Sequence, residues 1–348
     1  MKRLLLFLLV SLYSQLSLAE LQMERDANNR LLLSHESCDE LIKNTKVLDQ
    51  WTKNSHEKKS CPVNFQSPVQ KNNRCSYDVT DCLPDHVIKY GGVSPKYNGP
   101  NCWNLALVMK NILPALRHTT NEEMAFYMSS PLCRQIKNGE PKIPGDVGAI
   151  RKTSGVDQGE YHGFIYISDN LVYSKNGLAK ENPYMILSTN IMMDVYTVPK
   201  DPKCRKNEMD PSANCDFSTS YFRCMSMEEY LAKQNTPKEI MTAIRDVDNF
   251  DKCLESTTLS DQPLSKRAEK NLFDSLNVIS NYLYDETEKA KGSDLEDPKQ
   301  IFMLASLNLK LNAIAMQLGG DNKVGYGTAV QGFSEHIKAL TEELKGKK

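Results

Sequence analysis

The sequence predicts an α+β domain followed by an all-α helical domain, and three observations support this. An apolar stretch from residue 102 to about residue 116 has the spacing of a helix that packs against a core. Four short apolar runs with turn signals between them then indicate strands, at residues 146–152, 161–167, 171–177 and 191–198. From residue 226 onward, helix-capping signals alternate with helical stripes of apolar residues. One helix followed by a run of antiparallel strands is typical of an α+β fold.

Composition places the chain among ordinary globular proteins. It has 348 residues, of which 40% are hydrophobic and 25% are charged, and its net charge is −1. No run of basic residues forms a tail or a stripe. We therefore expect no nucleic-acid partner, since nucleic-acid binding requires a concentrated positive charge.

The first residues have the organisation of a secretory signal peptide. Lys2 and Arg3 give a short positive region, residues 4–12 are apolar, and Ser17 and Ala19 are small residues at the expected cleavage positions. The apolar run is roughly half of the ~20 residues that a membrane span requires. We expect cleavage after Ala19, a secreted or periplasmic location, and no transmembrane segment.

Export gives the ten cysteines a default role in disulfides, because the compartment is oxidising. They are Cys38, Cys61, Cys75, Cys82, Cys102, Cys133, Cys204, Cys215, Cys224 and Cys253. Their positions, together with the changes in composition, divide the chain into five expected segments. These are a signal peptide (1–19), a Cys-rich N-terminal segment (20–90), an α+β domain (91–200), a Cys-rich connector (201–225) and a helical C-terminal domain (226–348). A free Cys102 would leave a second free thiol, for which Cys133 is the candidate.

Cys102 is the candidate nucleophile. Asn101 is a good N-cap residue, which puts Cys102 at the first position of the apolar helix. At that position the free backbone amides and the helix dipole favour a thiolate. A thiolate nucleophile also needs a base, and His162 opens the most apolar of the predicted strands.

The predicted hairpin supplies candidates for a third group. A turn over residues 168–170 pairs Ile167 with Leu171 and therefore sets Asn176 directly opposite His162. Ser174 then lies on the diagonal. Either Asn176 or Ser174 could orient the imidazole by a hydrogen bond, as the third member of a catalytic triad does.

These residues resemble the NlpC/P60 group of papain-like cysteine peptidases over about residues 90–200. The matching features are a Cys at the start of a helix, the Pro144-Gly145-Asp146 turn before a strand, His162 at the start of the next strand, and a polar residue on the one after. The usual Asp-Cys-Ser-Gly is replaced by Asn-Cys-Trp-Asn at residues 101–104. The resemblance implies a papain-like core in which a nucleophile helix packs on an antiparallel sheet. It implies no metal or organic cofactor.

The resemblance also implies the activity of an exported bacterial amidase or peptidase that acts on cell-wall peptides or another peptide substrate. Cys102 would attack the amide carbonyl and form a thioester or transfer the acyl group, and its backbone amide would help to bind the oxyanion. His162 would move the proton, and Asn176 or Ser174 would orient it. Three alternatives stay open. Cys102 lies in a disulfide, or it is an inert buried thiol, or the domain is an inactive binding or scaffold protein whose helical domain contacts a protein partner.

Overall fold

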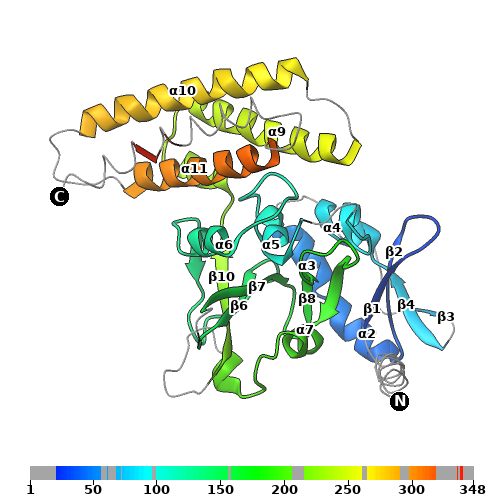
Figure 1. The fold of residues 1–348 in the computed structure, drawn as a ribbon. Helices are drawn as coiled ribbons and strands as arrows, with labels where there is room; N and C mark the ends of the chain where they lie inside the picture. The colour runs from blue at the N-terminus through cyan, green and yellow to red at the C-terminus, as the bar shows by residue number, and fades with distance from the viewer. Residues whose placement is uncertain are drawn as a thin grey trace, which may run out of the picture. The chain divides into compact units, whose positions relative to one another are not determined.

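The computed structural model describes residues 21–55, 61, 68–71, 73–95, 99–155, 158–205, 215–260, 265–290, 298–318, 335 and 338–339 (Figure 1). The expected signal peptide lies outside these residues. The chain divides into two compact units. Unit 1 contains Met1–Lys110, His118–Ala125 and Gln135–Cys224, and unit 2 contains Asn111–Arg117, Phe126–Arg134 and Met225–Lys348. The fold is of the α+β type, with antiparallel sheets and several helices.

The central sheet has six strands in the order β5-β10-β6-β7-β8-β9. Their bounds are Cys133–Gln135 for β5, Val147–Lys152 for β6, Gly159–Tyr166 for β7, Leu171–Lys175 for β8, Tyr184–Ser188 for β9 and Phe217–Cys224 for β10. The predicted hairpin is confirmed: Ile165 pairs with Tyr173, and the N–H of Ile167 donates to the carbonyl oxygen of Leu171 at 3.0 Å. The three-residue turn therefore has the register that the sequence predicts.

Two sequence predictions in this region need correction. Residues 191–198 do not form a strand, because the chain folds there into helix α7 (Thr189–Val195). A short apolar run has no period that separates a buried strand from a buried helix. The helix at residue 102 is also shorter than expected: α5 spans Cys102–Met109. Asn111 follows it with a φ of 52°, a left-handed conformation that ends helices, and Pro114 prevents the helix from resuming.

The two faces of the six-stranded sheet pack against different partners. One face forms a core in which Phe164 and Val172 pack against Met192 of α7. On the other face, α5 packs against β7 and β8. Gly163 makes this contact possible, since an added Cβ would lie 3.0 Å from Trp103 Cδ1 and 3.3 Å from its Cα. A side chain at this position would push the first turn of α5 away from the sheet.

The N-terminal part of unit 1 builds a second antiparallel sheet, in the order β1-β2-β4-β3. Its strands are β1 (Gln22–Arg25), β2 (Leu31–His35), β3 (Val69–Lys71) and β4 (Arg74–Asp78). Its helices are α2 (Cys38–Thr45), α3 (Leu48–Asn54), α4 (Asp85–Tyr90) and the short 3-10 helix η1 (Thr80–Cys82). Trp51 of α3 is buried, and its ring centroid lies 5.8 Å from that of Tyr173 on β8. This contact joins the N-terminal part to the central sheet.

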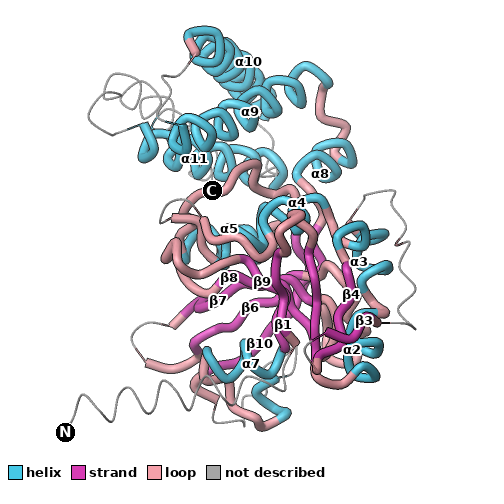
Figure 2. Tube along the Cα trace, turned by 90° about the vertical axis from the view of Figure 1, so that its right-hand side faces the viewer, coloured by secondary structure: helices cyan, strands magenta, loops and turns pink. Residues whose placement is uncertain are grey.

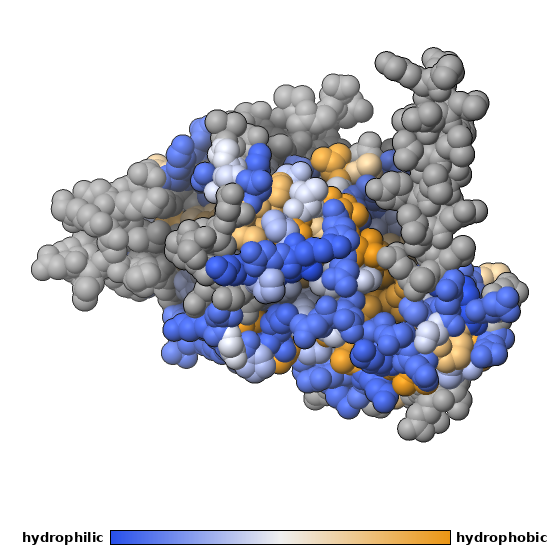
Figure 3. All heavy atoms as spheres, turned by 90° about the horizontal axis from the view of Figure 1, so that it is seen from below, coloured by the Kyte–Doolittle hydropathy of each residue, from blue (hydrophilic) through white to orange (hydrophobic). Residues whose placement is uncertain are grey.

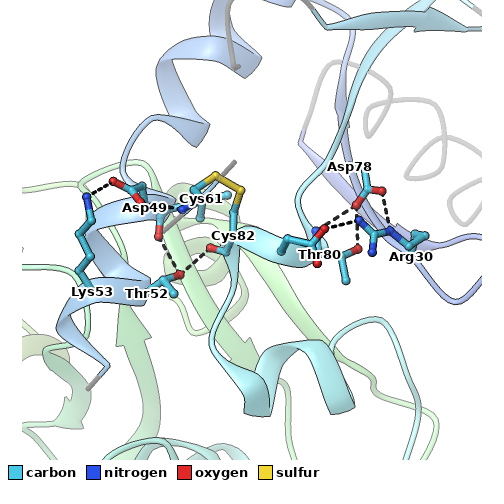
Figure 4. The surroundings of a disulfide bond; sticks show 10 residues. Arg30, Asp49, Thr52, Lys53, Cys61, Asp78, Thr80 and Cys82 are labelled. Carbon is cyan, nitrogen blue, oxygen red and sulfur yellow. Dashed lines mark hydrogen bonds and ion pairs between the residues drawn. A yellow bond between two sulfur atoms is a disulfide. The ribbon is translucent and has the colours of Figure 1, made fainter. Parts of the chain in front are cut away.

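Disulfides fix this small sheet and its helices. Cys38 is bonded to Cys75, and Cys61 to Cys82. Figure 4 shows how α3 holds the second bond: the backbone N–H of Cys61 donates to Asp49 Oδ1 at 2.9 Å, and Thr52 Oγ1 donates to the carbonyl oxygen of Cys82 at 2.6 Å. Both partners of the disulfide are therefore attached to one helix.

Helices dominate unit 2 (Figure 2). They are α8 (Met227–Lys233), α9 (Lys238–Ser260), α10 (Lys266–Ala290) and α11 (Pro298–Leu318), and α6 (Asn121–Met128) crosses from unit 1. The predicted capping box at the start of α8 is present, with Ser226 and Glu229 bonded reciprocally. The predicted stripe on α10 is buried in the core between α9 and α11, at Leu272, Leu276, Ile279 and Leu283. The second helical stripe that the sequence predicts, at Phe333, Ile337, Leu340 and Leu344, lies outside the described residues.

None of the helices in the described part of the chain is long and apolar enough to cross a bilayer. On the face drawn in Figure 3, hydrophilic residues predominate among those described, and hydrophobic ones lie between them in small patches.

Candidate active site

The state of each cysteine decides which thiols are available for chemistry. Cys102 and Cys253 are free, whereas the other eight are half-cystines. The prediction for Cys133 is therefore wrong, because Cys133 is disulfide-bonded and the second free thiol is Cys253 on α9. Cys204 is bonded to Cys215. Four disulfides are typical of a protein that folds in an oxidising compartment.

Cys102 is the first residue of α5, as predicted, and a hydrogen-bonded frame holds it there. Asn101 is the N-cap, and its Oδ1 accepts from the backbone N–H of Asn104 at 3.0 Å. Its Nδ2 donates to the carbonyl oxygen of Thr119 at 2.7 Å, and Asn104 Nδ2 donates to Thr119 Oγ1 at 3.3 Å. Both asparagines that differ from the NlpC/P60 pattern thus fix the start of the helix to residue 119.

The Cys102 thiol is buried and neutral in this conformation. Its residue is 5% exposed. Burial raises the pKa of the thiol from 9.0 to about 11. Hydrogen bonding from the backbone amides of Gly163, Trp103 and Cys102 itself, and the positive charge of Lys175, lower this pKa only in part. The amide of Gly163 belongs to the residue next to His162, so the sulfur lies beside the middle of β7.

His162 is completely buried and is oriented by Ser174. Its Nε2 and Ser174 Oγ are joined by a hydrogen bond of 2.9 Å. Its Nδ1 is buried and has no hydrogen-bond partner among the residues that the structure describes. The ring stacks on that of Tyr196, with centroids 3.8 Å apart and planes at 20°. Burial lowers the pKa of His162 from 6.5 to about 3, so the imidazole is neutral at physiological pH.

The structure joins two of the four predicted site residues directly and leaves a gap between them and Cys102. Ser174 contacts His162 on the sheet face that packs against α7. The Cys102 sulfur is near the backbone amide of Gly163, on the face that packs against α5. No hydrogen bond joins Cys102 to His162 Nδ1 in this conformation. Asn176 lies just after β8, and its carbonyl oxygen accepts from Asn182 Nδ2. Ser174 is therefore the residue of the pair that holds the imidazole.

Two functional candidates were missed by sequence reasoning. Lys175 has no exposed surface, and it interacts electrostatically with the Cys102 thiol. Tyr196 covers one face of His162 and also interacts with the thiol. A lysine that closes the apolar strand LVYSK was a signal for the first. Tyr196 gave none, because its place depends on α7, which the sequence pattern presents as a strand.

An open groove lies on the sheet face that carries α5. It is lined by polar residues from β6, β7 and β10, including Arg151, Glu160, Ser218 and Ser220. Arg151 Nε donates to Glu160 Oε1 at 2.6 Å, and Glu160 is buried. Strand β7 links the groove to the candidate site, because Glu160 precedes His162 on that strand.

The described residues include no group of three or more His, Cys, Asp or Glu side chains that could hold a metal ion. The groups of the candidate site are the Cys102 thiol, the His162 imidazole, the Ser174 hydroxyl and the Lys175 ammonium group. Comparison of the chain with protein-family models, with curated proteins and with solved structures found no match.

Proposed function

We propose that the protein is an exported cysteine hydrolase that cleaves an amide bond in a peptide, with cell-wall peptides as the first substrate class to test. The observation that supports this most is a free thiol at the first position of an N-capped helix, near the backbone of a strand whose histidine is oriented by a hydroxyl group. In a chain where eight other cysteines are half-cystines, retention of this thiol requires a reason. Nucleophilic catalysis provides one.

The hydrogen bond to Ser174 favours the imidazole tautomer that the reaction needs. When Nε2 carries the proton and donates to Ser174 Oγ, Nδ1 keeps a lone pair and has no competing partner. Cys102 Sγ attacks the carbonyl carbon while its proton passes to His162 Nδ1. The C–N bond then breaks, the leaving amine takes that proton, and a thioester remains. Water hydrolyses the thioester with His162 as the base, and the free thiol is restored.

Backbone amides at the start of α5 would bind the oxyanion. The N–H of Cys102 is one of the first amides of the helix, which have no partner inside it. Asn101 and Asn104 hold this turn in place through Thr119. Because no hydrogen bond joins the thiol to the imidazole in this conformation, substrate binding must bring them together before the proton moves.

A product assay with matched controls tests the proposal. Purified cell-wall peptides are digested with the wild type, Cys102→Ser and Cys253→Ser, and new amine termini are quantified. We expect Cys102→Ser to abolish product and Cys253→Ser to match the wild type, because Cys253 is the other free thiol and lies on α9. Equal product from all three proteins contradicts the proposal.

A second candidate function is a binding or scaffold protein that retains a papain-like shape. The burial of Cys102 and the neutrality of both Cys102 and His162 favour it, because a substrate has no direct access to the thiol at rest. In that case, the helices of unit 2 would make the partner contact. Cys102→Ser and His162→Ala would then leave partner binding unchanged, and no peptide would be cleaved by the wild type.

A further inference from the structure

The groove on the α5 side of the central sheet contains an arginine that a buried carboxylate holds in place. Arg151 Nε donates to Glu160 Oε1 at 2.6 Å, and Arg151 Nη2 lies 2.5 Å from the same oxygen. The side chain of Glu160 is 1% exposed, whereas that of Arg151 is 40% exposed. Both residues line the groove. The negative member of the pair therefore lies under the surface, and the positive member is accessible.

A β-bulge makes this pair possible. Ile150 is paired with His162, so a regular antiparallel register would set Arg151 opposite Tyr161. The register shifts between Ile150 and Arg151, and Arg151 is instead opposite Glu160. Bulges re-aim side chains and are frequent beside functional sites. Strand β7 thus departs from regular pairing at the position that joins the carboxylate to the arginine.

Strand β10 extends this pair into a row of polar side chains across the sheet. Ser218 is opposite Arg151 on one side, as Glu160 is on the other, and residues opposite each other share a face. Ser220 begins the next row of that face, opposite Ala149. Both serines are buried and line the groove. A hydroxyl group can donate a hydrogen bond to an anion, so the groove has donors on both strands.

The contacts with Glu160 occupy one edge of the guanidinium group. They use Nε and Nη2, and a guanidinium group has five N–H donors in all. The edge formed by Nη1 and Nη2 is the second one at which a carboxylate can accept two parallel hydrogen bonds. Glu160 Oε2 has no hydrogen-bond partner among the residues that the structure describes, so the compensation of this charge depends on Arg151. The guanidinium group is therefore held in one orientation before a ligand binds.

Charge and size indicate which ligand fits the groove. Among the described residues, the charged ones that line it are Arg151, Lys152 and Glu160, which gives two positive charges against one negative charge. This balance favours an anionic group over a cationic one. The groove has a volume of about 620 Å³, which is typical of sites for organic ligands and far exceeds the size of one inorganic ion. The anion therefore belongs to a larger molecule.

We propose that this groove is a peptide-binding site in which Arg151 binds a carboxylate of the peptide. Ser218 and Ser220 donate hydrogen bonds to the same carboxylate or to the adjacent peptide carbonyl. Glu160 is a positioning residue, because it fixes Arg151 and does not contact the ligand. A C-terminal carboxylate and an acidic side chain share this chemistry. The inference goes beyond the proposed function and does not require Cys102 to be a nucleophile.

Binding of defined peptides tests the site without any turnover. All proteins carry Cys102→Ser, and dissociation constants are measured by calorimetry with N-acetylated tripeptides. One pair is Ala-Ala-Ala with a free C-terminus and with a C-terminal amide. The other pair is Ala-Glu-Ala-amide and Ala-Gln-Ala-amide. We expect the carboxylate member of at least one pair to bind about tenfold or more tightly than its amide, and that pair identifies the source of the carboxylate. Equal dissociation constants within both pairs, or no binding of any peptide, overturn the proposal.

Two matched arginine variants show whether Arg151 is responsible. Arg151→Lys keeps the charge and loses the bidentate edge, so we expect it to weaken binding of the carboxylate peptide by about tenfold or more. Arg30→Lys is the control, because the side chain of Arg30 is 39% exposed and is also ion-paired, with Asp78 and Asp81. It should match the parent protein. Parent-like binding by Arg151→Lys, in a protein with native tryptophan fluorescence, contradicts the proposal.

A double variant decides the question if a change at Arg151 alone prevents folding. Arg151→Met combined with Glu160→Met removes both charges and leaves no buried carboxylate unpaired. We expect this protein to bind the carboxylate and amide peptides equally, and retained discrimination between them refutes the site. Discrimination by the parent protein, without cleavage of any peptide by the wild type, keeps this inference and loses the proposed hydrolase activity. Cleavage that depends on Cys102, without discrimination in the groove, has the opposite meaning.

Discussion

Acid is expected to destabilise unit 1 through two buried histidines. Both ring nitrogens of His86 are buried without a hydrogen-bond partner, and its ring lies 4.8 Å from that of Tyr90 and 6.0 Å from that of Tyr184. Burial lowers the pKa of His86, and likewise that of His162, from 6.5 to about 3. The unfolded chain therefore binds protons below about pH 6.5 that the folded chain does not bind until about pH 3. The stabilisation that comes from keeping these histidines neutral is fully present above about pH 6.5, and it is lost as the pH falls from there to about pH 3.

The size of the effect follows from the two pKa values. Full protonation of the unfolded state would cost about 5 kcal/mol for each histidine. At about pH 5, where the folded imidazole is still neutral, the loss is about 2 kcal/mol per histidine. Hydrogen bonding lowers the pKa of Asp78 and of Asp169 below 3.8. These ion-paired carboxylates are therefore ionised at about pH 5 in the folded and the unfolded chain, and they contribute little to the loss there.

Urea unfolding followed by tryptophan fluorescence measures this loss in unit 1 alone, because both tryptophans, Trp51 and Trp103, belong to it. The free energy of unfolding is compared at about pH 7.5 and about pH 5 for the wild type, for His86→Leu and for the exposed control His118→Gln. We expect His86→Leu to lose about 2 kcal/mol less than the other two, since leucine removes the titrating group and breaks no hydrogen bond. Equal losses in all three proteins refute the reasoning.

Three further predictions concern stability. Ser174→Ala leaves the buried Nε2 of His162 unpaired and should lower the free energy of unfolding, measured in urea, by about 1–3 kcal/mol. An unchanged urea midpoint contradicts the hydrogen bond between His162 and Ser174. Gly148→Ala puts a Cβ 2.1 Å from Phe164 Cζ and should lower the free energy of unfolding by about 1–3 kcal/mol in the same assay. An unchanged midpoint contradicts this position of the Phe164 ring. Replacing Cys61 and Cys82 together by serine opens a link with a sequence separation of 21 and should cost about 2–4 kcal/mol, measured as a lower thermal midpoint.

Local patterns were sufficient to predict several parts of the structure. Asn101 is read as an N-cap from residue type alone, and the turn at 168–170 fixes the hairpin register because side chains alternate along a strand. The α+β class follows from the order of such elements. The stripe on α10 is buried as its helical spacing predicts.

Other parts depend on contacts between distant segments and leave no local pattern. Met192 and Met193 are apolar neighbours that suit a strand, but they pack into the core from a helix. The disulfide state of Cys133 depends on which sulfur approaches it in the fold. Lys175 acquires its place on the α5 side of the sheet from the strand register, and Gly163 admits the first turn of α5 there. Sequence spacing alone could not indicate that the charge of this lysine acts on the Cys102 thiol.

The nature of Cys102 as a nucleophile is tested most directly by trapping its acyl intermediate. Wild type and Cys102→Ser are incubated with cell-wall peptides, quenched in acid and digested with a protease. The mass of the peptide that contains residue 102 is then measured by mass spectrometry. We predict an added acyl mass on this peptide in the wild type, which hydroxylamine removes and which Cys102→Ser lacks. Turnover of the substrate with no adduct on Cys102, and with equal product from Cys102→Ser, would contradict the account.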